Sequence, residues 1–153
     1  MHILVISGPN LNLLGRREPH IYGSVSLEQI HAHLRAEARA LDCTVECFQS
    51  NHEGAIVDFL QEHYETADGA LLNPGGLTQH GVSVHDTIKA MPFPVVEVHL
   101  SNIHAREEWR SHSIISSAAR AQAVGFGWLS YVVALRGLVG VLRSEQPGAG
   151  NGG

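Results

Sequence analysis

The sequence predicts a three-layer α/β sandwich around a five-stranded parallel sheet. Short apolar runs alternate with longer segments in which apolar residues recur at helical spacing, from one end of the chain to the other. The chain has 153 residues, of which 44% are hydrophobic and 16% charged, a balance typical of one globular domain. We therefore expect a single domain over residues 1–143. The Gly-rich segment 144–153 has nothing to bury, and we expect it to be a disordered tail.

The predicted strands are short apolar runs, because strands of a parallel sheet are buried on both faces. They cover residues 3–6, 44–48, 70–72 and 95–100, with a weaker fifth strand at 121–125. Helices must connect successive parallel strands in the right-handed sense. At this chain length the pattern favours the flavodoxin-like strand order 2-1-3-4-5.

Four helices are expected between and after these strands. Ser26 and Gln29 have the spacing of a capping box, and Asn51 is placed as the N-cap of the second helix. The expected buried faces consist of Leu27, Ile30, Leu34, Ala38 and Leu41; of Ile56, Phe59 and Leu60; of Val84 and Ile88; and of Trp128, Tyr131, Val132, Leu135, Leu138, Val139 and Leu142.

Charge and apolar content exclude several classes of partner. The net charge is -5 and the only lysine is Lys89, which argues against nucleic-acid binding. The longest apolar stretches, 3–6 and 128–141, are too short or too interrupted to span a bilayer. Cys43 and Cys47 share a predicted strand at a separation of about 13 Å, beyond disulfide reach. With no leader pattern before the first strand, we expect a cytoplasmic protein that binds neither nucleic acid nor membrane.

The eleven histidines do not show the local spacing of a metal site. Neither HExxH nor CxxC occurs, and His80 and His85 have no carboxylate or thiolate set beside them in the sequence. The glycines at 75–76 lack the surrounding pattern of a nucleotide-binding loop. We therefore expect no metal and no cofactor.

Polar side chains follow three of the predicted strands, where ligands bind in open parallel sheets. These segments are residues 8–10 with the loop 13–23, residues 73–78, and residues 97–102. Each has a structural explanation as well: Asn10 could cap a turn, for example, and Glu97 with His99 could form a structural pair. Their convergence at one sheet edge is what predicts a site.

Four collinear motifs resemble the type II 3-dehydroquinate dehydratases, in register from residue 2 to about 142. They are GPNLNLLGRREP (8–19) with IYG (21–23), QSNHEG (49–54), NPGGLT (73–78) and EVHLSNIHAREE (97–108). The resemblance implies a flavodoxin-like fold, a homododecamer built from trimers, and conversion of 3-dehydroquinate to 3-dehydroshikimate through an enolate. This is a reaction of the shikimate pathway and of aromatic amino acid biosynthesis, although a catabolic role would use the same chemistry.

Roles for individual residues are also implied by the resemblance. Tyr22 would be the general base with Arg17 as its lid partner, and Asn10 would hold the water that stabilises the enolate oxygen. His99, oriented by Glu97, would protonate the departing hydroxyl. The implied substrate-binding residues are Asn73, Gln79, Leu100, Ser101 and Arg110, with Arg106 setting the charge around the base and Asp86 reaching a neighbouring subunit's site.

The proposed roles agree with the chemistry of these side chains. An unperturbed tyrosine loses its proton near pH 10, so Tyr22 needs its phenolate stabilised by a nearby guanidinium group. A histidine titrates near neutrality, and a carboxylate on the same strand face supports its charged form. Arg110 offers a fork that matches a carboxylate.

The sequence departs from the family at residues 78–81, which read TQHG where a histidine usually follows the threonine. Gln79 can donate and accept hydrogen bonds but carries no charge. On a helical turn His80 would point about 100° away from that position. The residues 128–131 (WLSY) also replace a common Gln-Gly-Tyr pattern. A diverged dehydratase for a related cyclic hydroxy-ketone is therefore the alternative function. A phosphoryl-receiver or flavin-binding module is a third possibility, but the first and third strand ends lack the acidic cluster or phosphate loop that it requires.

Overall fold

The computed structural model describes residues 1–16 and 19–148, and of residues 21 and 22 the backbone only. Its centre is a five-stranded sheet, in the order β2-β1-β3-β4-β5, in which every neighbouring pair is parallel. This confirms the predicted sheet and strand order. The strands are β1 (His2–Ser7), β2 (Thr44–Gln49), β3 (Gly69–Asn73), β4 (Val95–His99) and β5 (Ala121–Val124).

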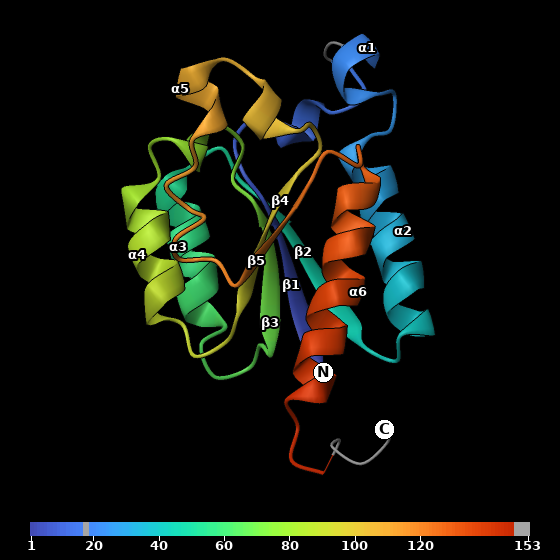
Figure 1. The fold of residues 1–153 in the computed structure, drawn as a ribbon. Coiled ribbons are helices and arrows are strands. Elements are labelled where there is room, and N and C mark those ends of the chain that lie inside the picture. The colour runs from blue at the N-terminus through green and yellow to red at the C-terminus, as the bar shows by residue number, and fades with distance from the viewer. Residues whose placement is uncertain (17–18, 149–153) are drawn as a thin grey trace.

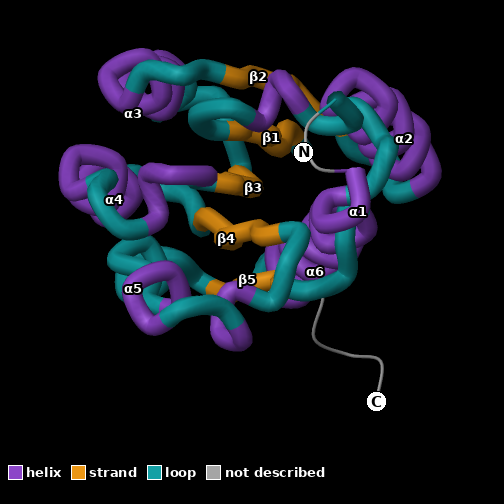
Figure 2. The backbone as a smooth tube through the Cα atoms, turned by 90° about the horizontal axis from the view of Figure 1, so that it is seen from above, coloured by secondary structure: helices purple, strands orange, loops and turns teal. Residues whose placement is uncertain are grey.

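Helices cover both faces of the sheet, as Figures 1 and 2 show. On one face lie α2 (Leu27–Ala40) and α6 (Leu129–Ser144), and on the other α3 (Glu53–Glu62) and α4 (Val82–Ala90). Two short helices, α1 (Pro19–Tyr22) and α5 (Glu108–Ser111), lie at the upper end of the molecule in Figure 1. The 3-10 helices are η1 (Leu11–Leu13), η2 (Gly75–Thr78) and η3 (Ile103–Ala105).

One hydrophobic core lies on each face of the sheet, and β1 contributes to both cores. Ile3 and Val5 belong to the core under α2 and α6, whereas Leu4 and Ile6 belong to the core under α3 and α4. All four side chains are fully buried. Burying an aliphatic side chain of this size contributes about 1.5–3 kcal/mol. The continuous apolar run of β1 is thus explained by helices on both faces.

The capping box at the start of α2 is confirmed, whereas the N-cap predicted for α3 is wrong. Ser26 Oγ accepts from the Gln29 amide at 3.1 Å, and Gln29 Oε1 accepts from the Ser26 amide at 2.9 Å. The N-cap of α3 is His52, and its side chain makes no capping bond. Asn51 Oδ1 instead accepts from the backbone N–H of Asn10 at 3.0 Å. Its side chain is thus used to join two loops at the sheet edge.

The C-terminal helix α6 extends to Ser144, and residues 149–153 of the predicted tail lie outside the described residues. The disorder of this tail therefore stays a prediction. None of the helices that the structure describes is both long enough and apolar enough to cross a bilayer.

Candidate active site

A cavity of about 300 Å³ lies at the carboxyl edge of the sheet. Its walls come from the segments that follow β1, β3 and β4, together with α5. This is the position at which open parallel sheets bind ligands. The cavity is lined by Pro9, Asn10, Leu11, Leu13, Leu14, Asn73, Gly75, Gly76, Thr78, Gln79, His80, His99, Leu100, Ser101, Ile103, Arg106, Trp109 and Arg110.

The loops after β1 and β3 pack against each other through two glycines. The Gly8 amide donates to the Asn73 carbonyl at 2.8 Å, and a Cβ on Gly8 would lie only 2.4 Å from the Pro74 carbonyl oxygen. Gly75 has a φ of +56°, and a Cβ there would lie 2.9 Å from the Pro9 oxygen. Only glycine fits these approaches. The two loops therefore form one unit that carries Asn10 and Asn73 into the cavity wall.

Two buried hydroxyl groups, one bonded to Asn73 and the other to the first hydroxyl, support this side chain. Its Nδ2 donates to the hydroxyl of Tyr131 at 3.2 Å, and that hydroxyl lies 2.9 Å from Ser7 Oγ. Burial raises the pKa of Tyr131 to about 12, so this phenol stays protonated. Asn73 Oδ1 accepts from the Gly75 amide at 3.2 Å. The protein itself thus fixes the orientation of this amide.

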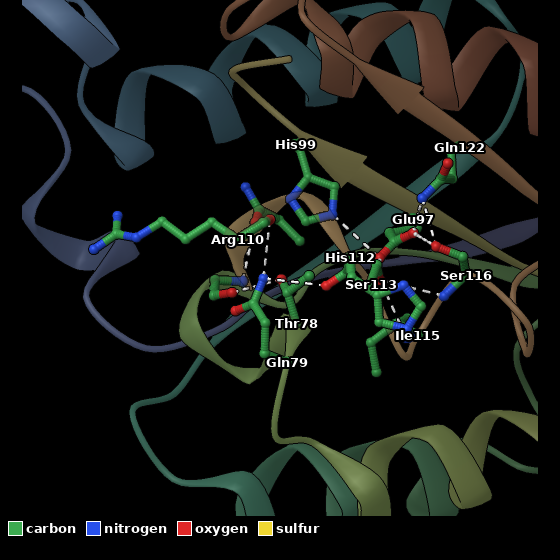
Figure 3. Close-up of polar contacts among 12 residues, drawn as sticks. Thr78, Gln79, Glu97, His99, Arg110, His112, Ser113, Ile115, Ser116 and Gln122 are labelled. Carbon is green, nitrogen blue, oxygen red and sulfur yellow. Dashed lines mark hydrogen bonds and ion pairs between the residues drawn. The ribbon is translucent and has the colours of Figure 1, made fainter. Parts of the chain in front are cut away.

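Glu97 is completely buried behind the cavity and accepts from three side chains (Figure 3). Ser113 Oγ donates to Oε1, while Ser116 Oγ, at 3.0 Å, and Gln122 Nε2 donate to Oε2. Burial alone would raise the pKa of Glu97, but the close His99 ring and the hydrogen bonds from Ser113 and Gln122 outweigh it and hold this pKa below its ordinary value. Glu97 is therefore a fixed negative charge.

His99 lies between this carboxylate and the cavity. Its Nε2 is 3.1 Å from Glu97 Oε1, close enough for an ion pair, although the contact is too bent to count as a hydrogen bond. Its other ring nitrogen is turned away from Glu97 in Figure 3, and the residue lines the cavity. The buried carboxylate fixes the position of the ring at the cavity wall. The pair can therefore present a proton to a ligand.

Two arginines give the cavity a positive character. Arg106 and Arg110 line it, whereas none of the lining residues that the structure describes carries a carboxylate. Arg110 Nε is buried without a hydrogen-bond partner, since Glu107 approaches it only to 3.8 Å. The guanidinium group also stacks on the Trp109 ring, 4.4 Å from its centroid. Two guanidinium groups without a carboxylate in the lining make the cavity suited to an anionic ligand.

Gln79 and His80 both line the cavity, although we expected the rotation of a helical turn to direct His80 away from the position of Gln79. The reason is that η2 ends at Thr78 and α4 begins at Val82, so the two residues lie in the connection between the helices. Gln79 Nε2 donates to the carbonyls of Arg110, at 3.1 Å, and His112, at 3.4 Å (Figure 3). This side chain therefore holds the end of α5 over the cavity.

Most of the predicted site residues converge here. Glu97 lies behind His99, while Asp86 on α4 is exposed, accepts from His85 Nδ1 at 2.9 Å and does not line the cavity of its own chain. Arg17 and the side chain of Tyr22 fall outside the described part of the structure. The predicted residues that line the cavity are Asn10, Asn73, Gln79, His99, Leu100, Ser101, Arg106 and Arg110.

The sequence reasoning missed the hydroxyl and amide groups that support the site. Ser113, Ser116 and Gln122 bind Glu97, and Tyr131 was predicted only as a core residue. A buried glutamate on an apolar strand was the available signal, because such a charge requires several donors.

Comparison with known proteins agrees with this geometry. The sequence model of the family described as dehydroquinase class II matches residues 1–139. The chain belongs to this family. A 3-dehydroquinate dehydratase of Roseiflexus castenholzii is 49% identical over 148 residues, which cover 97% of this chain and 94% of the relative. A catabolic 3-dehydroquinase of Aspergillus clavatus is 53% identical over 133 residues, 87% of this chain and 89% of the relative.

A solved class II dehydroquinase structure shares the fold. The type II dehydroquinase from Butyrivibrio crossotus superposes with a TM-score of 0.88 at 41% identity, covering 90% of this chain and 97% of that one. Membership in the class II dehydroquinases confirms the family and the flavodoxin-like fold that the four motifs predicted. The relative named 3-dehydroquinate dehydratase and the relative named catabolic 3-dehydroquinase are of comparable identity to this chain.

Proposed function

We propose that this chain dehydrates 3-dehydroquinate to 3-dehydroshikimate through an enolate, with Tyr22 as base and His99 as acid. The observation that carries this proposal is the pairing, in one cavity, of a His99–Glu97 proton donor with the unpartnered Arg110 Nε. The substrate is a carboxylate that must lose a hydroxyl group. The arginine suits the first property and the histidine the second.

The reaction needs one proton removed and one delivered. The Tyr22 phenolate takes the proton from the carbon next to the ketone, and the resulting enolate is stabilised by a water held by Asn10. The enolate then re-forms the ketone while a carbon–carbon double bond forms and the hydroxyl leaves with a proton from His99. The balance is loss of one water molecule, with no oxidation or reduction.

Binding is assigned to the residues that surround this centre. Arg110 holds the substrate carboxylate, and Asn73, Gln79, Leu100 and Ser101 contact the ring hydroxyls. The presence of all five in the cavity wall supports this assignment. Arg106 and Arg17 stabilise the phenolate of Tyr22. The support for Arg17 and Tyr22 is the family pattern in residues 8–23, together with the position of α1 at the same end of the molecule as α5 (Figure 1).

A spectrophotometric assay with 3-dehydroquinate tests the proposed function. The product is a conjugated enone that absorbs in the ultraviolet, whereas the substrate is not conjugated. We expect steady product formation by the untreated enzyme and by enzyme dialysed against a chelator. No turnover with 3-dehydroquinate would refute the proposal.

Replacement of Arg110 by methionine should raise KM for 3-dehydroquinate about 10–100-fold, because a hydrogen-bonded charge contributes about 1.5–3 kcal/mol to binding. The value of kcat should change less, because the carboxylate is held equally before and during the reaction. Arg120→Met is the matched control, since Arg120 pairs with Glu145 and does not line the cavity. An unchanged KM in Arg110→Met would show that another group binds the carboxylate.

The alternative, a diverged dehydratase for a related cyclic hydroxy-ketone, rests on Gln79 and His80. We expect Gln79→His to change kcat/KM for 3-dehydroquinate by no more than about tenfold, the value of one neutral hydrogen bond. The reason is that Gln79 already serves the chain by holding the Arg110 and His112 carbonyls. Kinetics of His80→Gln, measured in parallel, test whether His80 serves in place of the histidine that the family usually has at position 79. A much larger gain in Gln79→His would favour the alternative.

The assembly and the location of the protein stay predictions. The family pattern implies a dodecamer of trimers in which Asp86 reaches a neighbouring subunit's site, and the exposure of Asp86 on α4 supports such a contact. Light scattering should then give about twelve times the mass of one chain.

A further inference from the structure

Two histidines and a glutamate meet at the amino end of the sheet, away from the catalytic cavity. His2 opens β1, Glu46 lies on β2, and His63 is the C-cap of α3. Glu46 Oε2 is 2.9 Å from His2 Nε2 and 2.8 Å from His63 Nε2. One ligand atom from each residue lies within 4.8 Å of the other two. Three elements thus direct two imidazole nitrogens at one carboxylate oxygen.

In His2 and His63 the Nδ1 atom points away from Glu46, and its hydrogen bond determines whether Nε2 is free to bind a metal. His63 Nδ1 lies 2.8 Å from the Phe59 carbonyl oxygen, which can only accept, so this nitrogen carries a proton. His2 Nδ1 lies 2.8 Å from Thr44 Oγ1, whose own proton is directed to the Met1 carbonyl. Both rings are therefore held by Nδ1–H, and the lone pair of each neutral ring is at Nε2. Metal-binding histidines are oriented by the same kind of outer hydrogen bond.

The surroundings also favour a cation. His63 follows the last turn of α3, where the helix carbonyls concentrate partial negative charge. The Asp68 carboxylate is close by and accepts from the His2 amide at 2.6 Å. The three side chains are only partly buried, with 31%, 45% and 14% of their surface exposed for His2, Glu46 and His63. An ion can reach the group from solvent without unfolding.

We propose that His2, Glu46 and His63 form a zinc site that joins β1, β2 and the end of α3. Two imidazoles and one carboxylate are a ligand set that zinc uses, and a water would complete the tetrahedron. Zinc bonds of about 2.0–2.2 Å place neighbouring ligand atoms about 3.3 Å apart, so the group need open by only about 0.5 Å. Local spacing did not predict this site because its residues come from three separate elements.

The role of this site is structural. Six residues of β1 separate its two ends by roughly 20 Å, so the ion is far from the carboxyl edge where the cavity lies. Bound zinc would cross-link the edge strand β2 to its neighbour and to α3. It therefore stabilises the folded chain and leaves dehydration unaffected.

Calorimetric titration of the untagged full chain with zinc chloride tests the proposal. The protein is first treated with a chelator and studied at slightly alkaline pH, where free imidazole is neutral. We expect one zinc per chain, and zinc at about 100 times its dissociation constant should raise Tm by about 5–10 °C. Turnover of 3-dehydroquinate should be equal with and without zinc.

Variants separate this site from adventitious binding by the other histidines. Glu46→Gln and His63→Gln should each weaken zinc binding at least about 10–100-fold and lose the rise in Tm. His33→Gln, which changes an exposed histidine on α2, should bind zinc like the wild type. The far-UV circular dichroism of each variant checks its folding. Absence of stoichiometric binding, or unchanged binding by Glu46→Gln, would overturn the proposal and leave a cluster held by protonated histidines.

Discussion

Replacing Tyr22 by phenylalanine should lower kcat for 3-dehydroquinate about 10³–10⁴-fold, near the upper range for loss of a general base. The proton to be removed is bound to carbon and only weakly acidic, so water is a poor substitute for a phenolate held beside it. KM should change little, because phenylalanine keeps the aromatic ring. Steady-state kinetics, monitored by the absorbance of the enone product, measure both constants.

Tyr64→Phe is the matched control for this prediction. It removes the same hydroxyl from an exposed tyrosine outside the cavity and should leave kcat unchanged. Arg17→Met tests how the base is activated. Loss of a guanidinium group raises the pKa of a neighbouring phenol, so the acidic limb of the kcat/KM profile should move to higher pH. Wild-type turnover by Tyr22→Phe would assign the base to another residue.

The second large effect is expected for His99. His99→Gln should lower kcat about 10²–10³-fold, because the hydroxyl would leave without a proton donor. Glutamine keeps hydrogen-bonding capacity but cannot transfer a proton near neutral pH.

His104→Gln provides the comparison, since His104 is exposed on η3 and does not line the cavity. Its kinetics should match those of the wild type. The unfolding temperature of His99→Gln must be measured as well, because Glu97 loses a close neighbour on this substitution. A His99→Gln enzyme with full kcat would exclude His99 as the acid.

The elements of the fold could be predicted because each depends on a local pattern. The run 3–6 became β1 (His2–Ser7), and the spacing of Ser26 and Gln29 became a complete capping box. Asn51 failed as an N-cap because a residue type favoured at caps is equally suited to bridging loops, and only the folded sheet brings Asn10 within its reach. Such choices depend on contacts between segments far apart in the chain.

The same distinction separates the predicted from the unpredicted parts of the site. Residues such as His99 and Arg110 lie in motifs or at strand ends, where chemistry and position agree. Ser113, Ser116 and Gln122 lie between β4 and the middle of β5, where no periodic pattern indicates which side chains turn inward. The proposed zinc ligands were the hardest to predict from the sequence, because 44 residues separate His2 from Glu46 and 17 separate Glu46 from His63.

The interlocked loops around Gly8 and Gly75 have a consequence for protein engineering. Lengthening either loop would displace the other, so Asn10 and Asn73 cannot be moved independently of each other. Libraries that seek altered ring specificity are therefore better built at Gln79 and His80, in a connection free of that mutual constraint. The interlocked loops form a fixed part of the cavity wall, and the connection at Gln79 and His80 is where new selectivity can be introduced.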